Sequence, residues 1–148
     1  MQTQVMFYQL NDNEPTETNS VFYHACLQAC YFYRQNQRVF IYTQDQSQAE
    51  QIDELLWAFD SDSFVPHNLV GEGSKQGAAV EISNQAPCSR RPVLINLTRT
   101  MPDFANQFQL IVDFVPSDEE LKQQARERFK TCRQWGFIVN NQAVAEPH

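Results

Sequence analysis

Glycine is scarce in this chain of 148 residues: it occurs four times, and three of the four fall within residues 71–77. Loops that bind phosphate need glycines at fixed spacing, because a side chain would keep the backbone N–H groups away from the phosphate. The segment GEGSKQG has Gln76 where a Walker loop needs Ser or Thr and where the dinucleotide fingerprint needs Gly or Ala. We therefore predict a plain loop over residues 71–77, with a small nucleotide-binding α/β enzyme as the alternative function.

Long apolar runs and targeting signals are also missing. No stretch of about 18 consecutive apolar residues occurs, and the first twenty residues have no basic cluster followed by an apolar segment. We therefore expect a cytoplasmic protein that makes no membrane contact. Because thiols are kept reduced in the cytosol, four cysteines are predicted to be small buried side chains without disulfides: Cys26, Cys30, Cys88 and Cys132.

Basic residues are in the minority, with 11 Lys and Arg against 18 Asp and Glu, which gives a net charge of −7. A net negative surface repels phosphate backbones at long range, so direct binding to DNA is disfavoured. A local basic stripe on an acidic protein can still bind a small acidic partner. Direct DNA binding through such a stripe is a third possible function, and it predicts retention on single-stranded DNA without a protein partner.

What the chain does contain is an alternation of strand and helix patterns. Apolar runs and helical periodicity predict, in chain order, strand 4–10, helix 20–36, strand 38–43, helix 47–59, loop 60–77, strands 78–83, 92–98 and 108–115, and helix 117–135. Ser47 with Glu50, and Ser117 with Glu120, match the capping-box pattern.

Strands and helices that alternate at short separations form βαβ units. We predict one α/β domain over residues 1–139, with a central mostly parallel sheet flanked by helices, and a polar tail over residues 140–148.

The last predicted helix has the clearest pattern of charge. At about 100° per residue, Lys122, Arg126, Phe129 and Arg133 fall within roughly 60° of one another. One interpretation is the solvated edge of an amphipathic helix. The other follows from Phe129, because an aromatic surface flanked by cations suits a short peptide that has both carboxylates and an apolar end.

A second candidate surface is the segment WAFDSDSFVPHNL over residues 57–69. Its large apolar side chains either fold back onto the core or form a patch that binds a partner, and the residues alone leave both open. His24 and His67 have no Cys or His at ligand spacing, and no nucleophile motif accompanies them. We therefore predict no metal, no cofactor and no catalytic residue.

Several segments together resemble one known family, in order and at matching spacing across nearly the whole chain. These segments are FY at 7–8, DELLWAF at 53–59, SFVPHNLVGEG at 63–73, AAVEI at 78–82, VLINL at 93–97, VDFVP at 112–116, LKQQARERFK at 121–130 and GF at 136–137. They resemble the chi subunit family of DNA polymerase III. The resemblance implies a three-layer, Rossmann-like fold that binds no nucleotide, and hence no catalytic site of its own.

The resemblance also implies a role as a bridge between two proteins during DNA replication. Chi-like proteins join the psi subunit of the clamp loader, as a heterodimer, to the acidic, Phe-terminated tail of the single-stranded-DNA-binding protein, so that contact with DNA is only indirect. The tail-binding site maps to Lys122, Arg126 and Phe129, with Val115 and Arg133 beside them. Family members have Tyr at the position of Phe129.

The psi-contacting surface maps to the second candidate segment. By this resemblance the residues that contact psi are Trp57, Phe64, Val65, Pro66 and His67. The expected location is the cytoplasm, at the replisome on the nucleoid.

Overall fold

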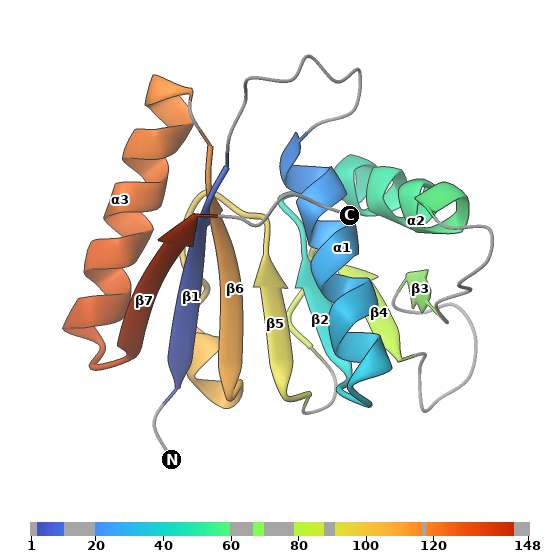
Figure 1. Ribbon diagram of the computed structural model, residues 1–148, viewed down its shortest axis with the longest axis horizontal. Helices are drawn as coiled ribbons and strands as arrows, with labels where there is room; N and C mark the ends of the chain where they lie inside the picture. The colour runs from blue at the N-terminus through green and yellow to red at the C-terminus, as the bar shows by residue number, and fades with distance from the viewer. Residues whose placement is uncertain are drawn as a thin grey trace.

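The structure is a computed structural model in which a parallel sheet lies between layers of helix (Figure 1). It describes residues 3–10, 20–59, 67–69, 79–87, 91–116 and 118–143. In chain order the elements are β1 (Gln4–Gln9), α1 (Ser20–Arg34), β2 (Val39–Tyr42), α2 (Gln46–Phe59), β3 (His67–Leu69), β4 (Val80–Ser83), β5 (Val93–Asn96), the 3₁₀ turn η1 (Ala105–Gln107), β6 (Leu110–Val115), α3 (Glu119–Gln134) and β7 (Ile138–Ala143).

The described strands form one sheet in the order β3-β4-β2-β5-β6-β1-β7. Every pairing between them is parallel, so the predicted α/β fold with a mostly parallel sheet is confirmed. The central strand β5 is buried at all four positions, VLIN, as expected for a strand that is covered on both faces. The pattern of apolar residues along the chain therefore follows from the position of each strand in the sheet.

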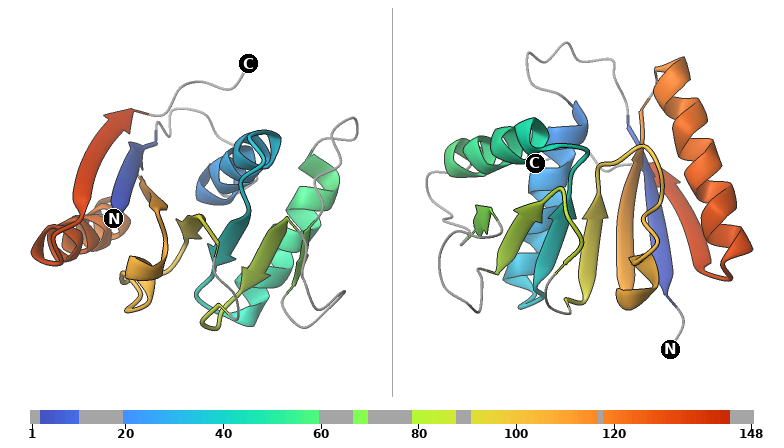
Figure 2. Two further views of the ribbon diagram at one scale, coloured as in Figure 1. Left: turned by 90° about the horizontal axis from the view of Figure 1, so that it is seen from below. Right: turned by 180° about the vertical axis from the view of Figure 1, so that it is seen from behind.

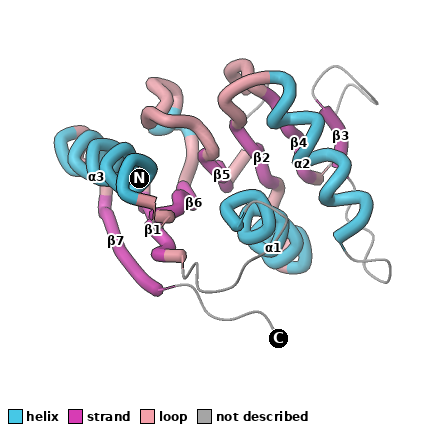
Figure 3. The backbone as a smooth tube through the Cα atoms, turned by 90° about the horizontal axis from the view of Figure 1, so that it is seen from above, coloured by secondary structure: helices cyan, strands magenta, loops and turns pink. Residues whose placement is uncertain are grey.

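Helices on opposite faces of the sheet give the fold its three layers. Figure 2 shows α1 on one side of the strands and α3 on the other, and Figure 3 shows the same separation from above. One buried cluster joins α1 and α2 to residues such as Ile41 and Ile95. The other joins Cys132 of α3 to Phe7 and to residues around η1. Alternate residues of β1, β2, β5 and β6 thus point into different clusters.

Two of the helices end in the same backbone motif. After α1, Asn36 has a φ of 60°, and the N–H of Gln37 donates to the carbonyl oxygen of Phe32 at 2.9 Å. After α3, Gly136 has a φ of 81°, and the N–H of Phe137 donates to the carbonyl oxygen of Cys132 at 3.1 Å. Both are Schellman motifs, which favour Gly or Asn in the left-handed position. The predicted end of the last helix before Gly136 is confirmed.

The predicted cap of α2 at Ser47 is wrong. The helix begins at Gln46, and the Asp45 Oδ1 accepts the hydrogen bond of the Gln48 N–H at 2.8 Å. Ser47 lies inside the first turn, where its hydroxyl accepts a hydrogen bond from Gln51. Asp45 takes the role of cap because it stands directly before the first helical residue, which is the N-cap position.

Two strands lie where the sequence predicted none. The three-residue strand β3 falls within the predicted loop 60–77, and it pairs with β4. Strand β7 pairs with β1 and continues to Ala143, so residues 140–143 of the predicted tail belong to the sheet. Its side chains are mostly exposed and three of the six are polar, so it has neither the alternating nor the continuous apolar pattern that identifies a strand.

The buried thiols of this fold are expected to be unreactive. Cys26, Cys30 and Cys132 are buried and form no disulfide, and burial raises the pKa of Cys26 and of Cys132 to about 12. At pH 8 such a thiol is about 10⁻⁴ thiolate, and the thiolate is the reactive form. In a Cys88→Ser variant, Ellman's reagent should therefore react with none of these thiols in the native protein, and with all three in 6 M guanidinium chloride. Rapid native labelling would contradict this packing.

Candidate functional site: a cationic groove beside helix α3

Helix α3, which carries the predicted stripe of cations, begins after Asp118. The Asp118 Oδ2 accepts a hydrogen bond from the Leu121 N–H at 3.1 Å, and the backbone of Asp118 is extended. Asp118 is therefore the N-cap, while the predicted cap Ser117 lies outside the described residues. Glu119 and Glu120 follow in the first turn, where carboxylates stabilise the positive end of the helix dipole.

The inner face of α3 packs on the sheet and includes one arginine. Ala125, Arg128 and Cys132 are buried, with exposed fractions of 1%, 7% and 0%. Leu121, one turn earlier, is 44% exposed. Arg128 was not predicted as a core residue. Its angular position could have indicated burial, because it lies about 240° around the helix from Lys122, close to Cys132 at about 280°.

Arg128 forms a bidentate ion pair with Asp113 of β6. Its Nε lies 2.8 Å from Asp113 Oδ2, and one Nη lies 3.0 Å from Asp113 Oδ1. The guanidinium also donates to the carbonyl oxygens of Phe114 and Arg99, each at 3.2 Å. Burial raises the pKa of the Asp113 carboxyl, and the guanidinium of Arg128 opposes that rise. The pair therefore fixes α3 against β6 in one position along the strand.

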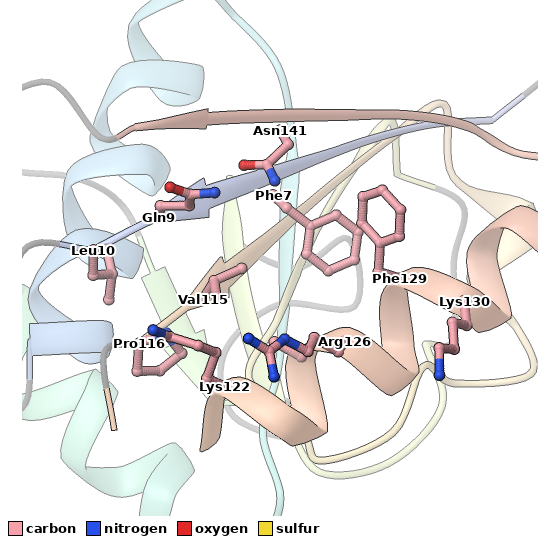
Figure 4. Close-up of a pocket in the computed structure, with 11 residues that line it drawn as sticks. Phe7, Gln9, Leu10, Val115, Pro116, Lys122, Arg126, Phe129, Lys130 and Asn141 are labelled. Atoms are coloured by element: carbon pink, nitrogen blue, oxygen red, sulfur yellow. The ribbon is translucent and has the colours of Figure 1, made fainter. Parts of the chain in front are cut away.

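A groove of about 500 Å³ opens between the outer side of α3 and the carboxyl ends of β1, β6 and β7 (Figure 4). We call it the α3 groove. Its lining residues are Phe7, Gln9, Leu10, Val115, Pro116, Lys122, Ala125, Arg126, Phe129, Lys130 and Asn141. Four of the five residues predicted for the tail-binding site are among them: Val115, Lys122, Arg126 and Phe129.

The two walls of the α3 groove differ in chemistry. Figure 4 shows Lys122 and Arg126 projecting from the helix wall, with Gln9 and Asn141 on the strand wall opposite. Cations bind carboxylates, whereas amide side chains both donate and accept hydrogen bonds with a peptide backbone. The walls therefore match an extended chain that has acidic side chains.

The floor of the α3 groove is apolar and aromatic. Phe7 is fully buried, and its ring centroid lies 5.4 Å from that of Phe129, with the planes tilted by 53°. Phe129 itself is only partly buried, so its ring contacts the core on one side and the groove on the other. Leu10 and Pro116, which are both buried, add to the apolar lining. This floor can receive an apolar or aromatic side chain.

Arg133 does not line the α3 groove. It lies on the other side of Phe129, in a second cavity of about 390 Å³ that is lined by Phe129, Arg133, Phe137 and Val139. The predicted residues do follow one another along α3, but they line two separate concave regions. Phe129 lies between the region of Lys122 and Arg126 and the region of Arg133. Helix periodicity alone could not predict this division, because the ring of Phe129 packs against Phe7, which lies on strand β1.

The cations of both regions are available to a ligand. Among the described residues, no ion pair involves Lys122, Arg126 or Arg133. The side chain of Arg126 makes one long hydrogen bond, to Gln123 at 3.5 Å. Lys130 lies 3.8 Å from Glu127, and both side chains are more than half exposed. Little intramolecular pairing thus competes with an incoming carboxylate.

Several residues of the α3 groove were missed by sequence reasoning. Gln9 and Leu10 end the first predicted strand, and Pro116 follows the strand that ends at Val115. The carboxyl ends of neighbouring parallel strands meet at one edge, so adjacency of these two strands would have brought the residues together. Asn141 gave no such signal, because β7 itself was not predicted.

The second predicted surface lies at the opposite edge of the sheet. Trp57 is in the last turn of α2 and His67 opens β3, which contacts α2 and forms the edge farthest from β7. Phe64, Val65 and Pro66 lie outside the described residues, as do the side chains of Trp57 and His67. The backbone of Trp57 and His67 is therefore separated from the α3 groove by the width of the sheet.

Other chemistry has little support within the part of the chain that the structure describes. There, no three His, Cys, Asp or Glu side chains cluster in a way that could hold a metal ion. No described helix is both long enough and apolar enough to cross a membrane. The glycine-rich residues 71–77, on which the nucleotide-binding alternative depends, lie outside the described residues.

Comparison with known proteins gives matches over nearly the whole chain. The family model described as DNA polymerase III chi subunit, HolC, matches residues 1–140. The DNA polymerase III subunit chi of Escherichia coli strain K12 is 45% identical over 137 residues, covering 90% of this chain and 93% of the relative. The subunits chi of Haemophilus influenzae and Pseudomonas aeruginosa are 40% and 30% identical, covering 93% and 94% of this chain and 95% of each relative.

A solved structure extends the comparison to the fold alone. The crystal structure of T4 UvsW matches with a TM-score of 0.61 at 9% identity, covering 97% of this chain and 41% of that one. The fold and the α3 groove define an α/β protein with a concave cationic surface beside an edge strand. The matches in sequence go further: the chain belongs to the DNA polymerase III chi subunit family.

The buried ion pair leads to a prediction about stability. Replacing Arg128 by Met leaves the Asp113 carboxylate buried without its partner, which should lower the free energy of unfolding by about 3–5 kcal/mol. Urea unfolding followed by circular dichroism measures the change. Lys130→Met is the matched control, because Lys130 is exposed, and it should change stability by less than about 0.5 kcal/mol. A loss below about 1 kcal/mol for Arg128→Met would show that the pair does not hold α3 in place.

Proposed function

We propose that the chain is a non-catalytic accessory subunit of the DNA polymerase III holoenzyme, within its clamp-loader complex. In this role it bridges the psi subunit to the acidic C-terminal tail of the single-stranded-DNA-binding protein during DNA replication. Membership of the chi subunit family over residues 1–140 supports the assignment to the polymerase. The shape and charge of the α3 groove support the assignment of the tail.

The observation that carries the proposal is the pairing of a cationic wall with an aromatic floor. Lys122 and Arg126 provide positive charge at the rim, and Phe129 with Val115 provides apolar surface beneath. A peptide tail that ends in an apolar ring and carries carboxylates satisfies both at once. A phosphate backbone would leave the floor unoccupied and would meet the net charge of −7 of the whole chain.

The opposite edge of the sheet suits a second partner that binds at the same time. The residues assigned to psi follow or end α2 and open β3, whereas the α3 groove adjoins β7. Because the two surfaces share no element, occupation of one leaves the other accessible. This separation is what a bridging subunit requires.

A peptide titration tests the tail-binding site. An acetylated peptide that ends in Asp-Asp-Phe should bind the wild-type protein, and its affinity should fall as sodium chloride rises from 50 to 300 mM, because the contacts are ionic. Arg126→Gln should weaken binding about fivefold, as expected for the loss of one partly exposed ion pair. Isothermal titration calorimetry gives both values.

The matched control for this titration is Arg34→Gln. Arg34 is an exposed arginine in the last turn of α1, on the other face of the sheet, so the variant makes the same change in net charge away from the groove. Its affinity should equal that of the wild type. Equal affinities for Arg126→Gln and Arg34→Gln in low salt would remove the α3 groove as the binding site.

Co-purification tests the psi surface and its independence from the groove. Phe64→Ala should reduce the amount of psi recovered with the tagged chain, because it removes an aromatic side chain assigned to that interface. The same variant should bind the acidic peptide as tightly as the wild type. Lys122→Gln should show the reverse pattern, with psi retained and peptide binding weakened. Undiminished recovery of psi with Phe64→Ala would exclude the segment from the interface.

A further inference from the structure

The second cavity repeats the chemistry of the α3 groove on a smaller scale. Its volume is about 390 Å³, and it combines one cation, Arg133, with apolar surface from Phe129, Phe137 and Val139. Phe137 and Val139 are partly exposed and pack against the same buried cluster as Phe129. A cation next to aromatic surface is thus present twice along α3.

The two cavities adjoin at Phe129, which lines both. Arg133 lies about three helical turns beyond Lys122 on the same stripe, a distance of roughly 16 Å along the axis. An extended peptide covers that distance with about five residues, at roughly 3.3 Å each. One short segment can therefore contact both cavities without a bend in its backbone.

Arg133 has the properties of a site for a carboxylate. Its side chain is exposed, and among the described residues no acidic side chain pairs with it. Trp135, which is 45% exposed, stands edge-on to Phe137 with ring centroids 5.8 Å apart, so the apolar surface continues past the cavity. Aromatic side chains with this much exposure mark surfaces that partners cover.

We propose that the second cavity is an upstream subsite of the α3 groove, occupied by an acidic residue and an adjoining apolar residue about five positions before the end of the bound peptide. This inference rests on the proposed function, because it takes the occupant of the α3 groove to be the end of an acidic chain. The terminal residue brings an extra carboxylate and lies where the cations are concentrated, beside Lys122 and Arg126. The chain then runs past Phe129 toward Arg133, and the upstream carboxylate pairs with Arg133.

Three acetylated peptides test the subsite. The short peptide is Ser-Asp-Asp-Phe, the long peptide is Leu-Asp-Ser-Ser-Asp-Asp-Phe, and the length control is Ser-Ser-Ser-Ser-Asp-Asp-Phe. Wild-type protein should bind the long peptide about three- to tenfold more tightly than either of the others, because only that peptide supplies Leu and Asp to the second cavity. In a Trp57→Phe background, where Trp135 is the one tryptophan, fluorescence should respond to the long peptide alone.

Two variants locate the gain in affinity. Arg133→Gln should remove most of the advantage of the long peptide while leaving the short peptide within about 1.5-fold of its wild-type affinity. Arg34→Gln, the same charge change on the opposite face, should preserve the advantage. Both substitutions are at exposed positions, so folding is retained in each.

The possible results separate this inference from the proposed function. If the short peptide binds but all three peptides have equal affinity, the subsite is refuted and the tail-binding site stands. If Arg133→Gln weakens the short peptide as much as the long one, the end of the chain lies at the second cavity and the proposed direction is overturned. If wild-type protein binds none of the peptides, both the subsite and the proposed function are refuted.

Discussion

The bidentate pair between Arg128 and Asp113 holds α3 at a fixed position on the sheet, and both concave regions depend on that position. The groove has one wall on α3 and another on β1 and β7, so any slide of the helix would change the distance between them. Arg128 faces the sheet, whereas Arg126, two positions earlier, faces solvent. Two arginines of one helix thus have different environments: Arg128 is buried against the sheet, and Arg126 lines the α3 groove.

The order of the strands explains how the two candidate surfaces can lie at opposite edges of one sheet. Strand β3 forms one edge of the sheet and β7 forms the other, with the buried strand β5 between them. Each edge is bordered by a helix, α2 at one end and α3 at the other. A parallel sheet this wide keeps the edges apart without needing a second domain.

Much of this arrangement could be predicted from periodicity and composition. The alternation of strands and helices gave the α/β fold, and the spacing of Lys122, Arg126 and Phe129 gave the helix wall of the groove. The part of the strand wall on β7 could not be predicted, because β7 is mostly exposed and half polar, and only pairing with β1 identifies it as a strand. The separation of Arg133 from the groove could not be predicted either. It depends on the contact between the rings of Phe7 and Phe129, which are 122 residues apart in sequence.

The small size of the cationic groove on an acidic molecule has a kinetic consequence. At physiological ionic strength the field of a single charge fades over a Debye length of about 8 Å, so the groove attracts a ligand only after it has come near. A long polyanion meets the repulsion of the whole surface first, while a short flexible chain end can approach and enter. The net charge of −7 therefore disfavours the approach of a polyanion before any contact in the groove is made.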